Sequence, residues 1–316
     1  MKTSQITVEN FPLVNSDFDI CDVARVSMAK TANLYTKIQN VRLLNYLVRD
    51  KKKPHWSPFG HARICLKVED SVEKMFELFP ELLLKGNLAG FSWEGDSTEF
   101  YINGSLWAWY ENWALLHPVV REAVSFHGKR KYPETWNLLF NEEKECQWGS
   151  YIRVIQNGGT DRTNYRSFRV TCPIFIARQL VKHQVHMCWN EESRRYIDES
   201  PVFFDPVRFR TRPEGSIKQG SGGYLNEEDN ANAMSILGMS NSEAHMAYKY
   251  LLSIDVAPEE ARMVLPLNTQ VQWIWTASVE AWKRVLKLRD DPHAQTQAQD
   301  FAKKLRARLE EIQYET

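Results

Sequence analysis

The sequence has few cysteines, no excess of either charge and no long apolar run. Its 316 residues contain five cysteines, widely spread and without a Cys-x-x-Cys pair. This pattern argues against a disulfide scaffold and favours a reducing, cytoplasmic environment. The 40 basic and 40 acidic side chains cancel, so no basic surplus indicates binding to long nucleic acid. No apolar stretch reaches the length of a membrane span, and residues 1–14 lack the apolar core of a signal peptide.

Hydrophobic periodicity predicts an α+β fold in which helices dominate. Amphipathic helices are predicted at 36–50, at 71–85 (ended by Gly86) and at 242–256, and a further helix is predicted to begin at Pro258. The last predicted helix is at the C-terminus, where one apolar stripe contains Phe301, Leu305, Leu309 and Ile312. A strand is predicted at 62–68, and strands that run into helices at 97–116 (with a turn at Gly104), 167–184 and 270–289. The polar residues 128–149 are predicted as loop, and residues 199–228, rich in proline and glycine, as an irregular excursion.

Two separated stretches share a local pattern. "FYINGSLWAWYENW" and "WIWTASVEAWKRVL" place a serine, an alanine and a tryptophan at matching offsets after an aromatic strand. Three identities are too few to indicate a duplication. We interpret the two stretches as two uses of one strand-turn-helix unit.

The polar stretch "KHQVHMCWNEESRRYID", residues 182–198, concentrates groups that carry chemistry. If it continues the preceding helix, Gln179, His183, His186 and Asn190 share a face. Imidazole and thiolate are zinc ligands, but this spacing matches no closed four-ligand pattern, and we predict no metal site. Cys188 is either a nucleophile activated by a neighbouring histidine or an inert packing residue, and the second is the commoner role.

Five arginines lie in or beside apolar segments: Arg178, Arg194, Arg195, Arg262 and Arg289. A buried guanidinium needs an anionic or carbonyl partner. One interpretation is a set of salt bridges to Glu191, Glu192, Glu259 or Glu260. The other is a bidentate clamp on a phosphate, which guanidinium geometry suits. The residues alone leave both open.

Several stretches together resemble one family. "NEESRRY" resembles the Asn-Glu-x-Ser-x-Arg-Tyr signature of the flavin-dependent thymidylate synthases, and "CPIFIARQLVKH" resembles the segment that leads into it. "ARVS", "HWSPFGH", "ARMVLPL" and "LKLRDDPHAQ" match its other blocks in the family's order. The resemblance implies an antiparallel or mixed sheet flanked by long helices, in a homotetramer with composite active sites. The whole chain, residues 1–316, is then one elaborated domain.

The resemblance also implies a reaction and a set of site residues. Members methylate C5 of dUMP, a pyrimidine nucleotide monophosphate, using FAD, 5,10-methylenetetrahydrofolate and NADPH. Arg195 and Arg262 would clamp the phosphate and Arg289 would lie against the pyrimidine, where charge develops on carbonyl oxygens. The other implied residues are Gln179, Glu191 and Ser193 in the nucleotide pocket, with Ser193 and Arg289 as the catalytic pair, and Ser27, His55, Ser57, Lys182, His183, Arg284 and His293 around the cofactor.

The departures from the family pattern fall on the flavin side. The usual Arg-His-Arg triplet reads Lys182-His183-Gln184, and one extra residue before "NEES" requires a local bulge. The usual Asn-x-Arg reads Ser278-Val279-Glu280, so an unpaired Glu280 would repel a cofactor diphosphate unless Arg284, one turn on, neutralised it. Gly60 stands where the family usually has glutamate.

A large insertion, residues 69–164, interrupts the match. Its segment "EFYINGSLWAWYENW" is too apolar to be a solvated tail, and we expect it to pack on the core or on another subunit. Three functions stay open at this point. The first is methylation of dUMP, the second is hydroxymethylation of dUMP or dCMP (or methylation of dCMP) with altered flavin use, and the third is non-catalytic nucleotide binding.

Overall fold

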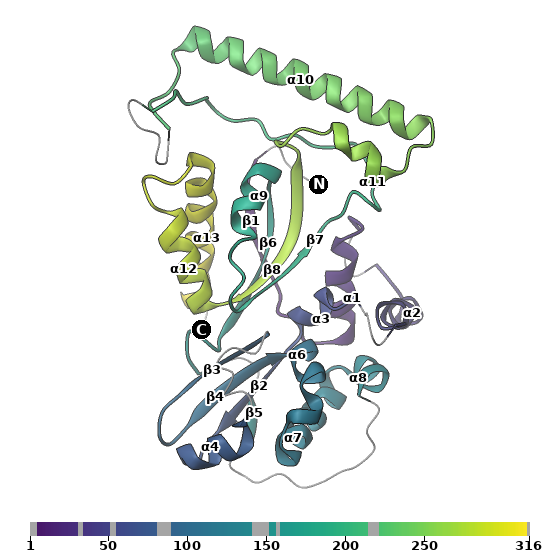
Figure 1. Ribbon diagram of the computed structural model, residues 1–316, viewed down its shortest axis with the longest axis vertical. Coiled ribbons are helices and arrows are strands. Elements are labelled where there is room, and N and C mark those ends of the chain that lie inside the picture. The colour runs from purple at the N-terminus through teal and green to yellow at the C-terminus, as the bar shows by residue number, and fades with distance from the viewer. Residues whose placement is uncertain are drawn as a thin grey trace.

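The chain forms two four-stranded antiparallel sheets, one above the other in the view of Figure 1, with helices along their sides. The computed structural model describes residues 5–30, 34–50, 55–80, 90–140, 152–155, 159–213 and 221–314. The mixture of helices and antiparallel strands confirms the predicted α+β class. The assignment of the whole chain to one elaborated domain stays a prediction.

The first sheet carries the motif-bearing half of the sequence. Its strands, in spatial order, are β1 (Thr7–Phe11), β6 (Tyr165–Pro173), β8 (Gln270–Ser278) and β7 (Met187–Glu191). Its helices are α9 (Ile174–Leu180), α12 (Val279–Arg289) and α13 (Thr296–Tyr314). Both predicted strand-to-helix transitions are confirmed here. Phe301 and Leu305 of the predicted α13 stripe are fully buried and Leu309 packs against the same core, while the side chain of Ile312 lies outside the described residues.

The second sheet is built mainly from the insertion. Its strands, in order, are β3 (Phe91–Gly95), β4 (Phe100–Ser105), β2 (Arg63–Val68) and β5 (Ile152–Ile155). Its helical segments are α4 (Val72–Leu78), α6 (Leu106–Glu111), η1 (Trp113–Leu115), α7 (Pro118–Lys131) and α8 (Pro133–Leu139). Trp109 and Trp136 are buried in one core with residues of the helices that precede β2. The apolar insertion therefore packs on the core, as expected.

Helices α1 (Asp17–Val26) and α3 (Ser57–His61) lie between the two sheets, and α2 (Lys37–Leu47) lies to the side of α1 (Figure 1). The buried ring of His61 reaches the first sheet, where Nδ1 lies 2.7 Å from Thr276 Oγ1. From the other direction, the Tyr165 hydroxyl donates to Ser92 Oγ at 3.0 Å. These contacts leave the ends of α1 and α3 facing β7.

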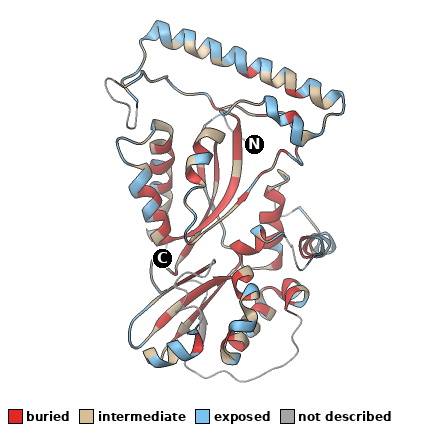
Figure 2. Cartoon of the chain, in the orientation of Figure 1, coloured by how far each residue is buried: buried red, intermediate tan, exposed pale blue. Residues whose placement is uncertain are grey.

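The longest helix, α10 (Glu227–Ser253), runs across one end of the molecule, and α11 (Pro258–Ala261) and η2 (Arg262–Val264) follow it (Figure 1). Pro258 occupies the first turn of α11, as predicted. Figure 2 shows α10 largely exposed, and Asn241 and Tyr248 are its buried residues. Within the described part of the chain, no helix is both long and apolar enough to span a membrane.

Several element predictions were wrong in place or extent. Residues 128–139 belong to α7 and α8 rather than to a loop, and residues 141–149 lie outside the described ranges. Gly104 is inside β4 and not in a turn. The helix predicted at 242–256 begins at Glu227, so the irregular excursion ends at Asn226, two residues earlier than predicted, and α4 ends at Leu78, with Gly86 outside the described residues.

Candidate active site

Residues 182–198 are not a helix. Helix α9 ends at Leu180, a turn follows, and β7 begins at Met187. His186, the last residue before the strand, has a left-handed backbone with φ of 59°. Because the stretch is a turn and a strand, the predicted shared face of Gln179, His183, His186 and Asn190 does not exist.

The extra residue before "NEES" is absorbed by this turn and not by the sheet. Strand β7 pairs with β8 without interruption from Met187↔Ala277 to Glu191↔Trp273. The carbonyl of His186 accepts the Ser278 amide at 3.2 Å and so fixes the end of the turn. The local bulge expected from the extra residue is therefore at His186, whose left-handed backbone precedes a regular pairing of β7 with β8.

A cavity of about 680 Å³ opens where α1, α2 and α3 face the end of β7. We call it the three-serine pocket, after Ser27, Ser57 and Ser193. Six predicted site residues line it: Ser27, His55, Ser57, Glu191, Ser193 and Arg195. They come from three separate stretches of the sequence, which the fold brings to one cavity.

A buried asparagine holds the three-serine pocket together. Asn190 donates to the Val23 carbonyl at 2.6 Å and to Ser27 Oγ at 3.3 Å. Its Oδ1 accepts from the Ser57 hydroxyl at 2.7 Å. The amide of Ser193 then donates to the carbonyl of Ser27 at 3.0 Å. Because one side chain ties α1, α3 and β7, the pocket is organised before any ligand arrives.

The pocket has one cation and one carboxylate near its mouth. Arg195 is exposed, with Nε 3.3 Å from Ser193 Oγ and its guanidinium 5.1 Å from the centre of the Tyr196 ring. Glu191 accepts from Trp189 Nε1 at 3.0 Å, and burial raises the pKa of its carboxyl group. Neither contact of Arg195 is to a carboxylate, so its charge is available to an anionic ligand.

A second cavity, of about 480 Å³, lies at the C-terminal end of α12. Its lining includes Gln179, Arg289 and His293, and we call it the Arg289 pocket. Arg289 donates through Nε to His183 Nε2 at 3.1 Å and through Nη2 to the Gln179 carbonyl at 2.8 Å. Burial, aided by Arg289, lowers the pKa of His183 to about 4, so the imidazole is neutral near pH 7 and accepts this hydrogen bond.

The remaining predicted residues lie outside both pockets. Arg262 is exposed on η2, where Nε donates to the Glu259 carbonyl at 3.1 Å. Lys182 is exposed in the turn after α9, and Arg284 donates to the carbonyl of Val185 at 3.1 Å. One chain thus does not bring Arg262 and Arg195 around one cavity. Of the five arginines singled out in the sequence, Arg194 is the one that is buried.

Cys188 is a packing residue beside Gly60. A β-carbon at Gly60 would lie 2.4 Å from Cys188 Sγ, so the sulfur fills the space that a larger residue at position 60 requires. Burial raises the pKa of the thiol to about 12, which opposes a nucleophilic role. Among the described residues, no three or more His, Cys, Asp and Glu side chains gather in a way that could hold a metal ion.

Glu280 is paired, but mainly by a residue that sequence reasoning missed. Arg162 donates to it from Nε at 2.9 Å and from Nη2 at 3.3 Å. The predicted partner, Arg284, is farther away, with Nη1 3.9 Å from Glu280 Oε1. Arg162 holds the pKa of Glu280 below its usual value, so both groups are charged. No local signal marked Arg162, because it lies 118 residues from its partner.

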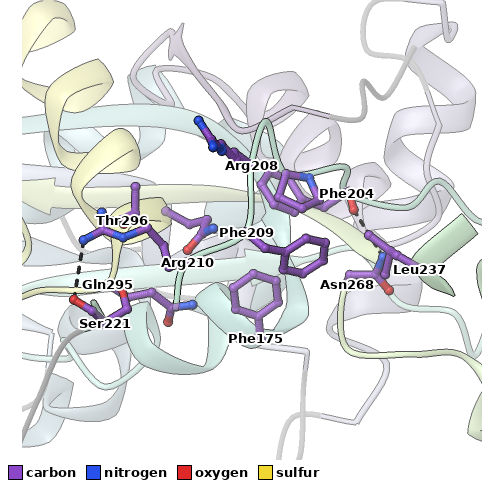
Figure 3. Close-up of a pocket in the computed structure, with 12 residues that line it drawn as sticks. Phe175, Phe204, Arg208, Phe209, Arg210, Ser221, Leu237, Asn268, Gln295 and Thr296 are labelled. Carbon is purple, nitrogen blue, oxygen red and sulfur yellow. Dashed lines mark hydrogen bonds between the residues drawn. The ribbon is translucent and has the colours of Figure 1, made fainter. Parts of the chain in front are cut away.

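A third cavity, of about 440 Å³, contains none of the predicted residues (Figure 3). The rings of Phe175, Phe204 and Phe209 line its centre, with Arg210 to one side. It shares Gln295 with the Arg289 pocket, and Gln295 Oε1 accepts from Gln179 Nε2 at 2.7 Å. The two cavities are therefore neighbours that share Gln295 in their walls.

Comparison with known proteins agrees with the motifs. The profile of the family described as "Thymidylate synthase complementing protein" matches residues 153–313. The flavin-dependent thymidylate synthase of Pseudothermotoga lettingae is 35% identical over 164 residues, which is 52% of this chain and 70% of that enzyme. The Aquifex aeolicus enzyme of the same name is 27% identical over 322 residues, 93% of this chain and 94% of its own, so its alignment extends into the 69–164 segment.

A solved structure of the UMP/dUMP methylase PolB from Streptomyces cacaoi, bound with 5-Br UMP, is 20% identical and covers 97% of this chain and 90% of its own, with a TM-score of 0.47. That likeness is too distant to identify a substrate. The profile match over half of the chain and the P. lettingae alignment are sufficient for the family: this chain belongs to the flavin-dependent thymidylate synthases, enzymes that transfer one-carbon units.

Proposed function

We propose that the protein methylates C5 of dUMP, with FAD as cofactor and 5,10-methylenetetrahydrofolate and NADPH as co-substrates. The observation that carries this proposal is the three-serine pocket, where six residues implied by the family motifs line one cavity of about 680 Å³. Its volume is in the usual range for small-molecule sites, and its walls combine aromatic rings with a few polar groups.

The phosphate of the nucleotide would be held by arginines. In the three-serine pocket, Arg195 has its Nε on Ser193 and keeps its other guanidinium nitrogens for an anion. Arg262 is exposed and lines neither pocket. A second subunit that brings its own Arg262 to this pocket would complete the clamp. This need for a second chain supports the proposal that the active site is composite.

Arg289 is the residue best placed to stabilise charge on the pyrimidine. Two hydrogen bonds, to His183 and to the Gln179 carbonyl, fix its guanidinium at the edge of its pocket. Neither partner carries a negative charge, because His183 is neutral and the other acceptor is a backbone carbonyl. These partners therefore do not neutralise the charge of Arg289. A fixed cation in a half-buried position strongly stabilises oxygen atoms that become negative during the reaction. Ser193 lines the other cavity of the same chain, so it would orient the phosphate end of this nucleotide where a second subunit brings its own Arg289 to the three-serine pocket.

The residues of the three-serine pocket fit a planar aromatic cofactor. The His55 ring stacks on Tyr46 with centroids 5.7 Å apart and planes 13° from parallel. Trp56 lines the cavity beside them. These rings line the same cavity as the hydroxyls of Ser27 and Ser57. Flavin, when bound, would supply the hydride that completes the methyl group, while the protein aligns nucleotide and folate.

The exposed face of α10 supports assembly into the homotetramer that the family resemblance implies. Ile236, Met239, Met246 and Tyr250 recur at steps of three, seven and four along the helix, and each is more than half exposed. A stripe of large apolar residues in solvent marks an interaction surface. Sedimentation equilibrium is the direct measurement, and a monomeric species at micromolar concentration would contradict a composite site.

The test of the reaction uses purified protein. We expect a yellow protein that releases FAD on denaturation, and release of tritium from 5-tritiated dUMP when methylenetetrahydrofolate and NADPH are present. Arg195→Ala and Arg262→Ala should each weaken dUMP binding in calorimetry. If wild-type protein binds dUMP but releases no tritium, it is a nucleotide-binding homologue without this activity, and the proposal is wrong.

A second candidate function is hydroxymethylation, of dUMP or dCMP. The contact between Gly60 and Cys188 and the pairing of Glu280 both alter the side of the site that the family uses for flavin. A hydroxymethyl product needs no net hydride, so it tolerates weaker flavin binding. Mass spectrometry of the nucleotide product separates the two, because a hydroxymethyl group is one oxygen heavier than a methyl group.

A further inference from the structure

The loop before β6 is attached to the N-terminus of α12. The carbonyls of Asn164 and Asp161 accept the Val279 and Glu280 amides at 2.8 and 2.9 Å. The carboxylate of Asp161 also pairs with Lys283 on the next turn. The first free amides of α12 are therefore capped by residues 159–164, at the end of the insertion. This helix start is closed to a ligand that would bind its backbone.

The same loop brings a guanidinium to this place. Arg162 makes a bidentate pair with Glu280, and Arg284 lies 3.9 Å from the same carboxylate. Two arginines thus flank one acid, so the group carries a net positive charge. The side chains of Arg162 and Arg284 are 43% and 44% exposed. Both are held in position by protein contacts and still open to solvent.

The turn after α9 completes the surroundings. Arg284 Nη2 donates to the Val185 carbonyl, which places the guanidinium beside that turn. The next residue, His186, has a buried Nδ1 that lacks a partner among the described residues. Each arginine keeps N–H groups that its protein partners do not use. A guanidinium with free N–H groups pairs well with phosphate oxygens, so two such groups side by side suit a ligand with two phosphates.

We propose that Arg162 and Arg284 form a clamp for the diphosphate of the dinucleotide cofactor, in which Arg162 of the insertion supplies the cation that position 280 does not. The clamp rests on the proposed function for the identity of its ligand. Glu280 has two effects in it: it orients Arg162, and it competes with the ligand for that guanidinium. Arg162, and not the rest of loop 159–164, is then part of the cofactor site.

The clamp predicts that only one member of this ion pair is needed for cofactor binding. Arg162→Ala should weaken binding of FAD, and of ADP as a diphosphate without flavin, by about tenfold to a hundredfold. Glu280→Gln should leave both affinities unchanged or tighten them by up to about fivefold. Asp161→Asn, which loses the pair with Lys283 in the same loop, is the matched control and should bind both ligands like wild type.

Calorimetric titrations of flavin-free protein with FAD, ADP and dUMP measure all of these. The dUMP affinity should be the same in every variant, and thermal melts identify any variant that fails to fold. Equal weakening by Arg162→Ala and Glu280→Gln would mean that the pair only anchors the loop, and the clamp would be rejected. Unchanged ADP affinity in Arg162→Ala would reject it too.

These titrations also separate the clamp from the proposed function. If wild-type protein binds dUMP and ADP but not FAD, the flavin-dependent reaction is wrong, and ADP affinity lost in Arg162→Ala still supports the clamp. If wild-type protein releases tritium from dUMP but binds ADP no better than Arg162→Ala does, the reaction stands and the clamp is wrong.

Discussion

The junctions β4–α6 and β8–α12 are built from the same local parts but surrounded differently. In each, a serine caps the helix: Ser105 Oγ accepts from Ala108 N at 3.1 Å, and Ser278 Oγ accepts from Ala281 N at 3.2 Å. One residue later, a fully buried tryptophan donates its indole N–H to a carbonyl of the neighbouring strand. The shared serine, alanine and tryptophan therefore specify a common strand-to-helix turn.

The differences lie in the residues around these shared parts. Two positions before the serine, Asn103 accepts from Arg63 at 2.7 Å in one junction, whereas Thr276 lies 2.7 Å from His61 in the other. Helix α6 ends after six residues in an aromatic core, whereas α12 continues for eleven and ends at Arg289. Local sequence thus determines the turn, and the length of the helix determines whether it reaches a site.

Removal of either tryptophan should have the largest effect on stability. Trp109→Ala and Trp282→Ala each empty a fully buried site, and each should lower the free energy of unfolding by about 3–5 kcal/mol. The two should differ in function, because Trp282 positions the helix that carries Arg289. Urea unfolding measures the first effect and dUMP calorimetry the second. Equal loss of dUMP affinity in folded samples of both variants would contradict the comparison.

Arg289→Lys should have the next largest effect, on rate and not on stability. Lysine retains the charge but cannot donate to His183 and the Gln179 carbonyl as a planar fork does. We expect a loss of about a hundredfold to a thousandfold in kcat, the usual effect of removing one donor that stabilises an oxyanion. Arg308→Lys, on α13 and paired with Glu311, is the matched control. A rate within threefold of wild type would remove Arg289 from the catalytic machinery.

Much of the fold was predictable because its signals are local. The break at Pro173 and the apolar stripe of α13 depend on residues within a few positions of each other, and both are confirmed. Of the residues that the family motifs imply, six line the three-serine pocket, while Gln179 and Arg289, implied for the same nucleotide pocket, line a second cavity. The role of each of these residues stays a prediction.

The failures share a physical cause, which is dependence on distant partners. Residues 187–191 look helical in isolation and become a strand because they pair with β8, more than eighty residues later. Gly104 suggests a turn, but a β-carbon there would lie 2.5 Å from Phe91 and 2.7 Å from Trp109, so close packing explains the glycine. Arg162 has no motif around it, and its role depends on Glu280 in another element.

A pH dependence should distinguish the two junctions. Burial lowers the pKa of His61 to about 3, from an ordinary value of 6.5, so the folded protein holds this ring neutral. Between these values the unfolded chain binds a proton that the folded chain does not, and stability falls as pH decreases from about 6.5. The free energy of unfolding should be lower at pH 5 than at pH 7.5.

Part of this slope should disappear in His61→Gln, whereas the corresponding contact of the other junction, between Arg63 and Asn103, contains no histidine. The pKa values of His127, His183 and His186 are also lowered by burial, each to about 4, and should maintain a residual slope. An unfolding free energy that is flat between pH 7.5 and 5 would contradict the buried neutral state of all four rings.

The two capping serines provide the smallest and most closely matched test. Ser105→Ala and Ser278→Ala each remove one hydrogen bond to a helix amide, and each should lower the free energy of unfolding by about 1 kcal/mol. Threonine at either position keeps the acceptor and should recover part of that loss. The caps differ in their surroundings, because Ser278 also donates its own amide to His186 and precedes the residues that loop 159–164 contacts. If Ser278→Ala costs no more than Ser105→Ala and leaves FAD affinity intact, the cap serves the fold alone, and the backbone contacts of the loop are sufficient to hold α12 in the site.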